Sequence, residues 1–335
     1  MQFIFTCRGA HRDLTLYEFK RYDASFNFIK WLDEEVGLAE TGLSRTDLPW
    51  LIRSAPIIFV RHIFFVDLMC APSELLDAAA SLCAAAEQPV SVQVRACPEP
   101  CEEPEGLSTR IAERLLSNGI ECDLKYGYAI LSIYVSNNII YLGLGDFTEN
   151  LSRYRGGMPF YSKSPELGFI SRAEFKLLEA FECFAIPADG INLALDLGAA
   201  PGGWTKALLE RGARVIAVDP LKLHPMLQKH NRVRHYAMTA ERYLALGTDE
   251  RFDMIVCDMK ANPEKSIAAV KRCYEKLTPG GYAIVTLKLE RGFSYKHVLG
   301  YLGSVQPYRI VGSRQLFHNR SEITVALKKP EENVN

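Results

Sequence analysis

The sequence predicts an α/β protein in which a doubly wound sheet fills the C-terminal half and a smaller α+β domain precedes it. Strand-like apolar runs recur in that half, at residues 193–196, 214–218, 233–237, 253–258, 281–288, 307–312 and 322–328. Helical patterns separate the first five runs, an alternation that is typical of parallel strands with helices on both faces. The last two runs lack a long helix between them, so we expect a closing hairpin and a Rossmann-like sheet of seven strands.

A glycine-rich turn follows the first of these strands. Residues 193–209, LALDLGAAPGGWTKALL, pass from a buried strand through three glycines into a helix. Glycine allows positive φ and close approach of a ligand, and amides at a helix N-terminus face that ligand. The next strand ends in Asp219, which can accept hydrogen bonds from two ribose hydroxyls. The turn lacks the G-x-G-x-x-G pattern of dinucleotide sites, and Pro201 removes an amide that a pyrophosphate would use. We therefore expect S-adenosylmethionine (SAM), a nucleoside cofactor without phosphates.

The cofactor contacts should come from this turn and from neighbouring strand ends. The expected residues are Asp196, Gly198, Ala199, Ala200, Pro201, Gly202, Gly203, Trp204, Asp219 and Asp258. After the third strand, the segment HYAMTAERYL has no acid where SAM-dependent enzymes commonly bind the adenine amine. Met238 and Thr239 can offer only apolar and hydroxyl contacts, so the adenine contacts stay open.

Length and composition indicate a globular chain of two domains, with 335 residues of which 48% are hydrophobic. The net charge of −1 means that any surface for nucleic acid must come from a local excess of basic residues.

Nine cysteines, an odd number, favour reduced thiols in the cytoplasm, and Cys97 and Cys101 lack the second pair of a zinc site. Charged residues interrupt the apolar run 55–70, and the N-terminus fits a first strand rather than a signal peptide. We therefore expect a cytoplasmic protein with no metal and no membrane contact.

The N-terminal half predicts alternating strands and helices without a catalytic motif. Ser108 or Thr109 should cap a helix that Gly119 ends. The apolar face of this helix is formed by Ile111, Leu115 and Leu116. Two strands, 128–135 and 139–144, should then form a hairpin.

This order of strand, helix and hairpin, over about residues 55–147, resembles a THUMP domain, an RNA-binding module of RNA-modifying enzymes. On pattern alone, a generic α+β domain also fits. The resemblance implies that residues 1–150 bind RNA, with a linker at 151–164 and a catalytic domain at 165–330. The linker interleaves aromatic residues with Arg153 and Arg155, which can contact a phosphate backbone or simply be solvated.

Four polar residues stand near the ends of strands in the C-terminal domain. Asp258 ends the fourth strand and Lys288 ends the fifth. Glu322 opens the last strand, and Lys176 lies on the helix that precedes the first. Because polar groups in apolar strands are costly unless they are paired, we expect these side chains to converge at the ligand-binding edge.

These segments resemble the Lys-Asp-Lys-Glu tetrad of the FtsJ-like ribose 2′-O-methyltransferases. The motifs CDM-x-x-x-P-x-K, LKL and H-x-R-x-E-x-T-V are similar, more narrowly, to bacterial members with a THUMP domain that methylate a cytidine ribose of large-subunit (23S) ribosomal RNA. The resemblance is strong over residues 165–328. It implies the seven-stranded class I methyltransferase fold, SAM as cofactor, and Lys176, Asp258, Lys288 and Glu322 as catalytic residues.

The chemistry explains the need for such residues. A ribose 2′-hydroxyl is a poor nucleophile, so an enzyme must remove its proton and align oxygen, methyl carbon and sulfur, without requiring a metal. Lys288 is the candidate base, because burial and the nearby ammonium of Lys176 favour a neutral amine. Asp258 and Glu322 would orient the two amines and partly oppose that effect. Lys288 can instead steer the oxygen while water takes the proton, and each of the four residues also admits a purely structural role.

RNA would approach over the same strand ends. Residues 206–234 hold seven Lys and Arg against two acids, and further basic residues flank the tetrad. The flanking residues are Arg172, Arg314, His318 and Arg320. A solvated charged face explains the same pattern. We expect RNA as the partner, ribosomal RNA foremost, and a monomeric enzyme.

Three alternatives remain open. Methylation of a base could proceed through Cys257, but this residue lacks the preceding proline of such enzymes. The substrate could be another RNA, such as a tRNA. The chain could also be a non-catalytic RNA-binding factor that keeps a SAM fold, although the complete tetrad speaks against this.

Overall fold

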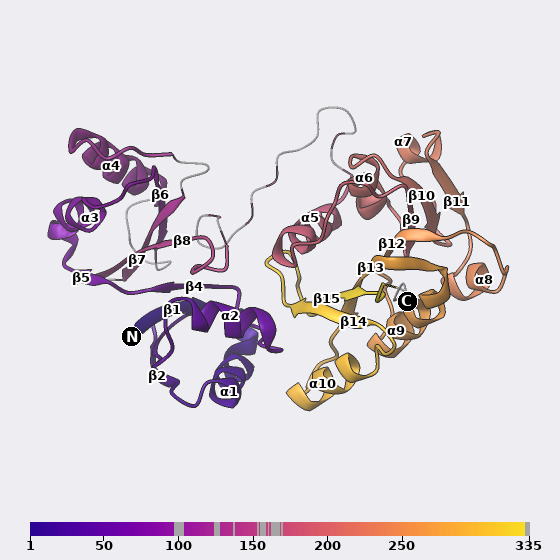
Figure 1. The fold of residues 1–335 in the computed structure, drawn as a ribbon, viewed down its shortest axis with the longest axis horizontal. Helices are drawn as coiled ribbons and strands as arrows, with labels where there is room; N and C mark the ends of the chain where they lie inside the picture. The colour runs from indigo at the N-terminus through magenta and orange to yellow at the C-terminus, as the bar shows by residue number, and fades with distance from the viewer. Residues whose placement is uncertain are drawn as a thin grey trace. The chain divides into compact units, whose positions relative to one another are not determined.

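The computed structural model describes residues 1–96, 104–123, 128–136, 138–152, 154, 159, 161, 168 and 170–331. The chain divides into two compact units, which we call unit 1 (Met1–Phe160) and unit 2 (Tyr161–Asn335). Figure 1 draws the elements of each unit. Arg153, Arg155, Cys97 and Cys101 lie outside the described residues, so their expected roles stay predictions.

Unit 1 begins with an antiparallel sheet of strand order β2-β3-β1-β4. Its strands are β1 (Gln2–Thr6), β2 (Asn27–Trp31), β3 (Val36–Glu40) and β4 (His62–Phe65). Two helices, α1 (Arg12–Tyr22) and α2 (Asp47–Ser54), cover one face of this sheet. Phe19 of α1 and Ile52 of α2 are fully buried there against Phe3 and Phe5 of β1. Burial of these rings holds the layers together.

A second sheet in unit 1 has the order β5-β8-β7-β6. Its strands are β5 (Leu68–Cys70), β6 (Val90–Ala96), β7 (Ala129–Ser136) and β8 (Ile139–Asp146). The expected hairpin is confirmed, because β7 and β8 pair antiparallel, whereas β6 and β7 pair in parallel. Helices α3 (Leu75–Cys83) and α4 (Pro104–Ser117) cover one face.

Helix α4 corrects two details of the sequence analysis. It begins at Pro104, a residue that suits the first turn of a helix, so Ser108 and Thr109 lie inside the helix and do not cap it. Leu116 is 57% exposed and does not belong to the apolar face, whereas Leu115 is fully buried. Gly119 ends the helix as expected, with a φ of +77°.

The two sheets of unit 1 pack against each other through a buried cluster that includes Ile4 and Phe64 from the first sheet and Tyr134 and Tyr141 from the second. His62 of β4 lies beside this cluster and is 3% exposed. It lines a small cavity of about 10 Å³ between the sheets. Burial, with a smaller contribution from a nearby arginine, lowers the pKa of His62 to about 3, so the folded protein keeps this imidazole neutral.

We expect His62 to make the stability of unit 1 depend on pH. In the unfolded chain His62 gains a proton below its ordinary pKa of 6.5, whereas the folded state resists protonation down to about 3. Stability should therefore fall as the pH drops below 6.5, by about 1.4 kcal/mol per pH unit and about 2 kcal/mol at pH 5. Urea unfolding of the wild type and of His62→Gln at pH 7.5 and pH 5 measures this. Equal losses in both proteins would show that other groups cause the dependence.

Unit 2 contains a sheet of seven strands in the order β11-β10-β9-β12-β13-β15-β14. Its strands are β9 (Leu193–Leu197), β10 (Arg214–Val218), β11 (Val233–Tyr236), β12 (Phe252–Cys257), β13 (Leu277–Lys288), β14 (Arg309–Arg314) and β15 (Glu322–Lys328). Strands β9 to β13 run parallel, and β15 pairs antiparallel with both β13 and β14. The seven expected strands and the closing hairpin are confirmed, with β15 inserted between β13 and β14.

Helices surround this sheet (Figure 1). They are α5 (Ala173–Cys183), α6 (Gly203–Leu209), α7 (Pro225–Gln228), α8 (Ala240–Leu244), α9 (Pro263–Arg272) and α10 (Tyr295–Gly303). The strand order reverses between β9 and β12, and in doubly wound sheets ligands bind outside the carboxyl ends of strands at such a switch point. The edge of the sheet where β9, β12 and β13 end is called the carboxyl edge below.

The described residues include no helix long and apolar enough to cross a membrane. The seven cysteines among them are all free thiols, as the sequence analysis expects.

Candidate active site

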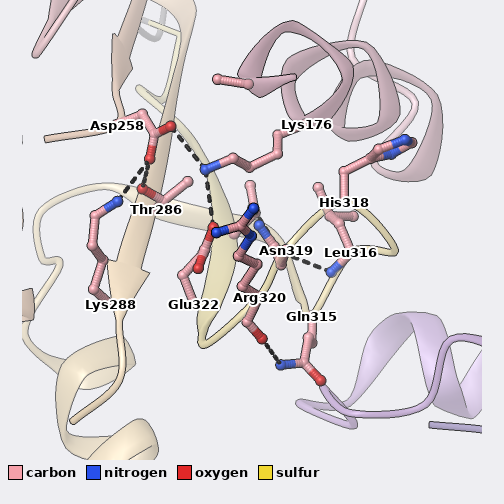
Figure 2. A network of polar contacts seen from close by, with 12 residues as sticks. Lys176, Asp258, Thr286, Lys288, Gln315, Leu316, His318, Asn319, Arg320 and Glu322 are labelled. Atoms are coloured by element: carbon pink, nitrogen blue, oxygen red, sulfur yellow. Dashed lines mark hydrogen bonds and ion pairs between the residues drawn. The ribbon is translucent and has the colours of Figure 1, made fainter. Parts of the chain in front are cut away.

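Four charged side chains meet at the carboxyl edge. Asp258 directly follows β12 and Lys288 ends β13, while Glu322 opens β15 opposite Lys288. The Lys176 Nζ atom, reaching in from α5, lies 2.8 Å from Asp258 Oδ2 and 2.9 Å from Glu322 Oε1. The Lys288 Nζ atom lies 3.3 Å from Asp258 Oδ1. Figure 2 shows these side chains pointing toward one another, so the structure brings together the four residues that the sequence singled out.

The two lysines of this cluster are held unequally. The Lys176 side chain is 12% exposed and pairs with two carboxylates, whereas Lys288 is 32% exposed and, among the described carboxylates, pairs only with Asp258. Burial by itself would lower the pKa of Lys176, but Asp258 and Glu322 together outweigh burial and raise that pKa above its ordinary value. Lys176 therefore stays an ammonium at neutral pH, and Lys288 is the less constrained amine.

Helix α5 also holds the loop that leads to Glu322. The Glu179 carboxylate accepts hydrogen bonds from the amides of Phe317 at 2.6 Å and His318 at 3.0 Å, and it lies 2.8 Å from His318 Nδ1. Because Lys176 and Glu179 are one turn apart on α5, the same helix fixes both partners of the Lys176–Glu322 pair. In the sequence, the only sign of this role is that Glu179 lies three residues after Lys176 on the same predicted helix.

The glycines of the turn after β9 have different roles. Gly198 and Gly202 adopt φ values of +80° and +118°, which confirms the expected left-handed backbone. Gly203 is instead the first residue of α6 and is not among the glycines with positive φ. A Cβ atom there would lie 2.3 Å from Ser171 Oγ, and one at Gly202 would lie 2.1 Å from Leu227 Cδ1. Both glycines therefore allow close packing of the protein on itself.

Asp196 at the end of β9 fits a cationic ligand. Its Oδ2 accepts a 2.6 Å hydrogen bond from Thr205 Oγ1, whereas its buried Oδ1 has no hydrogen-bond partner among the described residues. Burial, reinforced by Asp258 and Asp219 and opposed by Thr205, raises the pKa of Asp196 to about 7. A positively charged group beside Oδ1 would favour the ionised carboxylate. The sulfonium and ammonium groups of SAM have this property, so the residues present fit the cofactor.

Asp219, which directly follows β10, accepts a hydrogen bond from the glycine-rich turn after β9. Its Oδ2 accepts the amide of Ala200 at 3.1 Å and its Oδ1 accepts a second amide at 2.8 Å, which leaves each oxygen able to accept a ribose hydroxyl as well. The amides of Gly198 and Ala199 donate to the carbonyl of Val218 at 2.9 and 3.3 Å. These two amides therefore stabilise the turn by binding it to the end of β10.

Trp204 and Lys206 on α6 both make structural contacts with α5. Trp204 is 3% exposed, and its Nε1 donates to the carbonyl of Ala173 at 2.7 Å, so it packs α6 against α5. Lys206 forms a 3.0 Å ion pair with Glu174 of α5, and both side chains are 3% exposed. Lys206 is therefore not part of a basic surface, contrary to the sequence analysis.

The expected RNA-binding residues of unit 2 differ in exposure. Arg172 and Arg320 are exposed at the protein surface, whereas Arg314 is only 9% exposed. His318 is half-buried and engaged by Glu179. Arg172 and Arg320 are thus the better candidates for phosphate contacts.

The alternative of base methylation through Cys257 finds little support in the structure. Cys257 is fully buried, and burial raises the pKa of its thiol to about 12, which disfavours the thiolate needed to attack a base. Among the described residues, no group of three or more His, Cys, Asp or Glu side chains is arranged to hold a metal ion.

The fold and the sequence comparison define the class of unit 2. Residues 169–292 match the family model "FtsJ-like methyltransferase". Unit 2 is therefore similar, over these residues, to FtsJ-like methyltransferases. This similarity supports SAM as the cofactor.

Curated relatives carry the similarity further along the chain. The chain is 32% identical over 221 residues to "Ribosomal RNA large subunit methyltransferase M" of Edwardsiella ictaluri, covering 59% of this chain and 54% of the relative. It is 34% identical over 189 residues to the protein of that name from Proteus mirabilis, covering 51% and 50%. The chain thus spans about half the length of the curated relatives it matches. TrmN from Thermus thermophilus aligns over 98% of this chain and 100% of its own, at 15% identity and a TM-score of 0.38, too low to support an argument.

Proposed function

We propose that this protein is a SAM-dependent RNA ribose 2′-O-methyltransferase, acting on a cytidine of large-subunit (23S) ribosomal RNA. The observation that carries the proposal is the convergence of Lys176, Asp258, Lys288 and Glu322 at the carboxyl edge of an FtsJ-like domain. The names of the relatives, which specify large-subunit ribosomal RNA, support this class of substrate.

In the proposed reaction, SAM supplies an activated methyl group on a sulfonium. Lys288 takes the proton of the ribose 2′-hydroxyl, because it is the more exposed and more weakly paired amine. Lys176 stays charged and donates a hydrogen bond that fixes the nucleophilic oxygen. Asp258 orients both amines, and Glu322 completes the pairing of Lys176. The cluster thereby aligns the oxygen with the methyl carbon.

RNA contacts would come from both units. Arg172 and Arg320, exposed near the cluster, would neutralise phosphates on either side of the target nucleotide. Residues 1–150, with a THUMP-like part at about 55–147, would bind a second region of the RNA. The enzyme would act as a monomer in the cytoplasm, for which the free thiols of the described cysteines are suited.

Transfer of a tritiated methyl group from SAM tests the proposal. RNA from cells that lack the gene for this protein is incubated with the labelled cofactor and the enzyme. We expect label in a dinucleotide that survives alkaline hydrolysis, because a 2′-O-methyl group blocks attack on the adjacent phosphate. Lys288→Ala should lower this transfer about 10²-fold, the usual contribution of a positioned base.

The same experiment separates the alternatives. Label on a free base would indicate base methylation. Label in tRNA instead of 23S RNA would identify tRNA as the substrate. Undetectable transfer with normal SAM binding would favour a non-catalytic RNA-binding factor. Unchanged transfer by Lys288→Ala would exclude Lys288 as the base.

A further inference from the structure

Thr286 is a fully buried threonine whose hydroxyl contacts the cluster. Its Oγ1 donates a 2.6 Å hydrogen bond to Asp258 Oδ1, as Figure 2 shows. Thr286 and Lys288 are two residues apart on β13, so their side chains leave the same face of the sheet. The hydroxyl therefore lies on the side where the two lysines meet Asp258.

The hydrogen bond makes the two oxygens of Asp258 unequal. Oδ2 accepts from Lys176 at 2.8 Å, whereas Oδ1 is shared between Thr286 at 2.6 Å and Lys288 at 3.3 Å. A short bond to a carboxylate oxygen stabilises its negative charge, and a neutral donor does so without adding a positive charge. Lys288 thus faces a carboxylate oxygen whose charge is already partly satisfied.

Three charged groups of the cluster lie around Lys288 on neighbouring elements. Asp258 follows β12, Glu322 lies opposite Lys288 on β15, and Lys176 enters from α5. Glu322 directs Oε1 to Lys176 at 2.9 Å, so it favours the charge of that amine. The attraction between Asp258 and Lys288 is then the main interaction whose strength a neutral hydrogen-bond donor such as the Thr286 hydroxyl can change.

We propose that Thr286 is a positioning residue that fixes the Asp258 carboxylate and keeps Lys288 the more weakly paired amine. Lys288 rather than Lys176 consequently accepts the proton of the 2′-hydroxyl. The inference rests on the proposed function and deepens it, since it names the group that assigns different roles to the two lysines.

Thr286→Val, which keeps the shape and removes the hydroxyl, tests the inference. Without the hydrogen bond, Oδ1 should hold the Lys288 ammonium more tightly. The pH at which kcat reaches half its maximum should rise by about 0.5 to 1 unit, as loss of one hydrogen bond of about 1 kcal/mol implies. KM for RNA and for SAM should change less than about twofold, and Thr286→Ser should restore the wild-type profile. A uniform loss of kcat with the same midpoint would overturn the inference.

A second measurement reads the amine directly and needs neither cofactor nor substrate. Acetylation of Lys288 by trace acetic anhydride, followed by mass spectrometry across a pH series, reports the fraction of neutral amine. We expect the labelling midpoint of Thr286→Val to move upward by the same amount as the kinetic midpoint. Identical labelling curves in the variant and the wild type would contradict the proposed role.

Thr324 offers a matched control. It is a fully buried threonine that pairs with Thr286 across β13 and β15, but its hydroxyl donates to Asn319 Oδ1 at 3.1 Å. Thr324→Val should destabilise the protein without moving either midpoint, and an equal shift would overturn the inference. If the proposed function fails, wild-type enzyme gives no alkali-resistant dinucleotide. If only the present inference fails, that product forms and the Thr286→Val midpoints stay where they are.

Discussion

Asp258→Asn is expected to lower kcat for methyl transfer about 10³-fold, a loss of about 4 kcal/mol of transition-state stabilisation. Asp258 is the residue through which the two amines are connected, with Lys176 on Oδ2 and Lys288 on Oδ1. The asparagine keeps the shape but removes the charge, and its amide nitrogen would face an ammonium as donor against donor. Both amines would lose their common anchor, and the alignment of the 2′-oxygen would be lost with them.

Single-turnover kinetics with saturating RNA and SAM measure this effect without interference from product release. Asp253→Asn is the matched control, because Asp253 lies near the start of the same strand and its carboxylate accepts the amides of Asn192 and Leu193 at 2.9 and 3.1 Å. It should reduce stability and leave the single-turnover rate within about twofold. An Asp258→Asn enzyme with more than a tenth of the wild-type rate would falsify the assigned role of this carboxylate.

The seven strands of unit 2 were predictable because most of them are short, buried apolar runs whose pattern is local. The cluster could also be inferred, since Asp258, Lys288 and Glu322 each stand where an apolar run begins or ends. The carboxyl ends of the parallel strands share one edge of the sheet, and the antiparallel strand β15 begins at that same edge. The partners within the cluster were not predictable, because whether Lys176 pairs with Asp258, Glu322 or both depends on the distance between α5 and the sheet.

Other features escaped prediction for physical reasons. Strand β2 has mostly exposed side chains, so its sequence, NFIKW, lacks the alternation that marks a half-buried strand. Gly203 resembles a cofactor-binding glycine in the motif, yet its missing side chain makes room for Ser171 of the segment before α5. Thr286 and Glu179 look ordinary in sequence, because their importance comes from the carboxylate or amides that tertiary structure brings to them.

Helix α5 connects these observations, since it contributes a side chain to three different contacts. Lys176 reaches the cluster, Glu179 holds the loop before Glu322, and Glu174 pairs with Lys206 of α6. Helix α6 follows the turn that fits the cofactor. The Glu174–Lys206 pair therefore sets the position of Lys176 relative to that turn, so its removal should affect both stability and catalysis.

Lys206→Met should reduce the free energy of unfolding by about 3 kcal/mol at pH 8, the usual result of leaving one charge of a buried pair uncompensated. Burial already raises the pKa of Glu174, with Lys206 opposing it, and removal of Lys206 should raise that pKa further. A carboxyl whose pKa is raised in the folded state contributes most at low pH, and its contribution is lost as the pH rises through the folded pKa. The deficit of Lys206→Met should therefore be small at pH 5 and grow toward pH 8.

Chemical denaturation at both pH values measures this dependence. The double variant Lys206→Met/Glu174→Gln should recover much of the loss, because Glu210, the second partner of Lys206 at 3.4 Å, is 28% exposed and keeps access to water. Lys328→Met is the matched control, since its partner Glu331 is 78% exposed and such pairs contribute less than about 1 kcal/mol. A deficit of Lys206→Met that is independent of pH would mean that lost packing, rather than the uncompensated Glu174 charge, is responsible. The kcat of the double variant then distinguishes the two roles of the pair: if stability returns while kcat stays low, the ion pair itself positions α5 and, through it, Lys176.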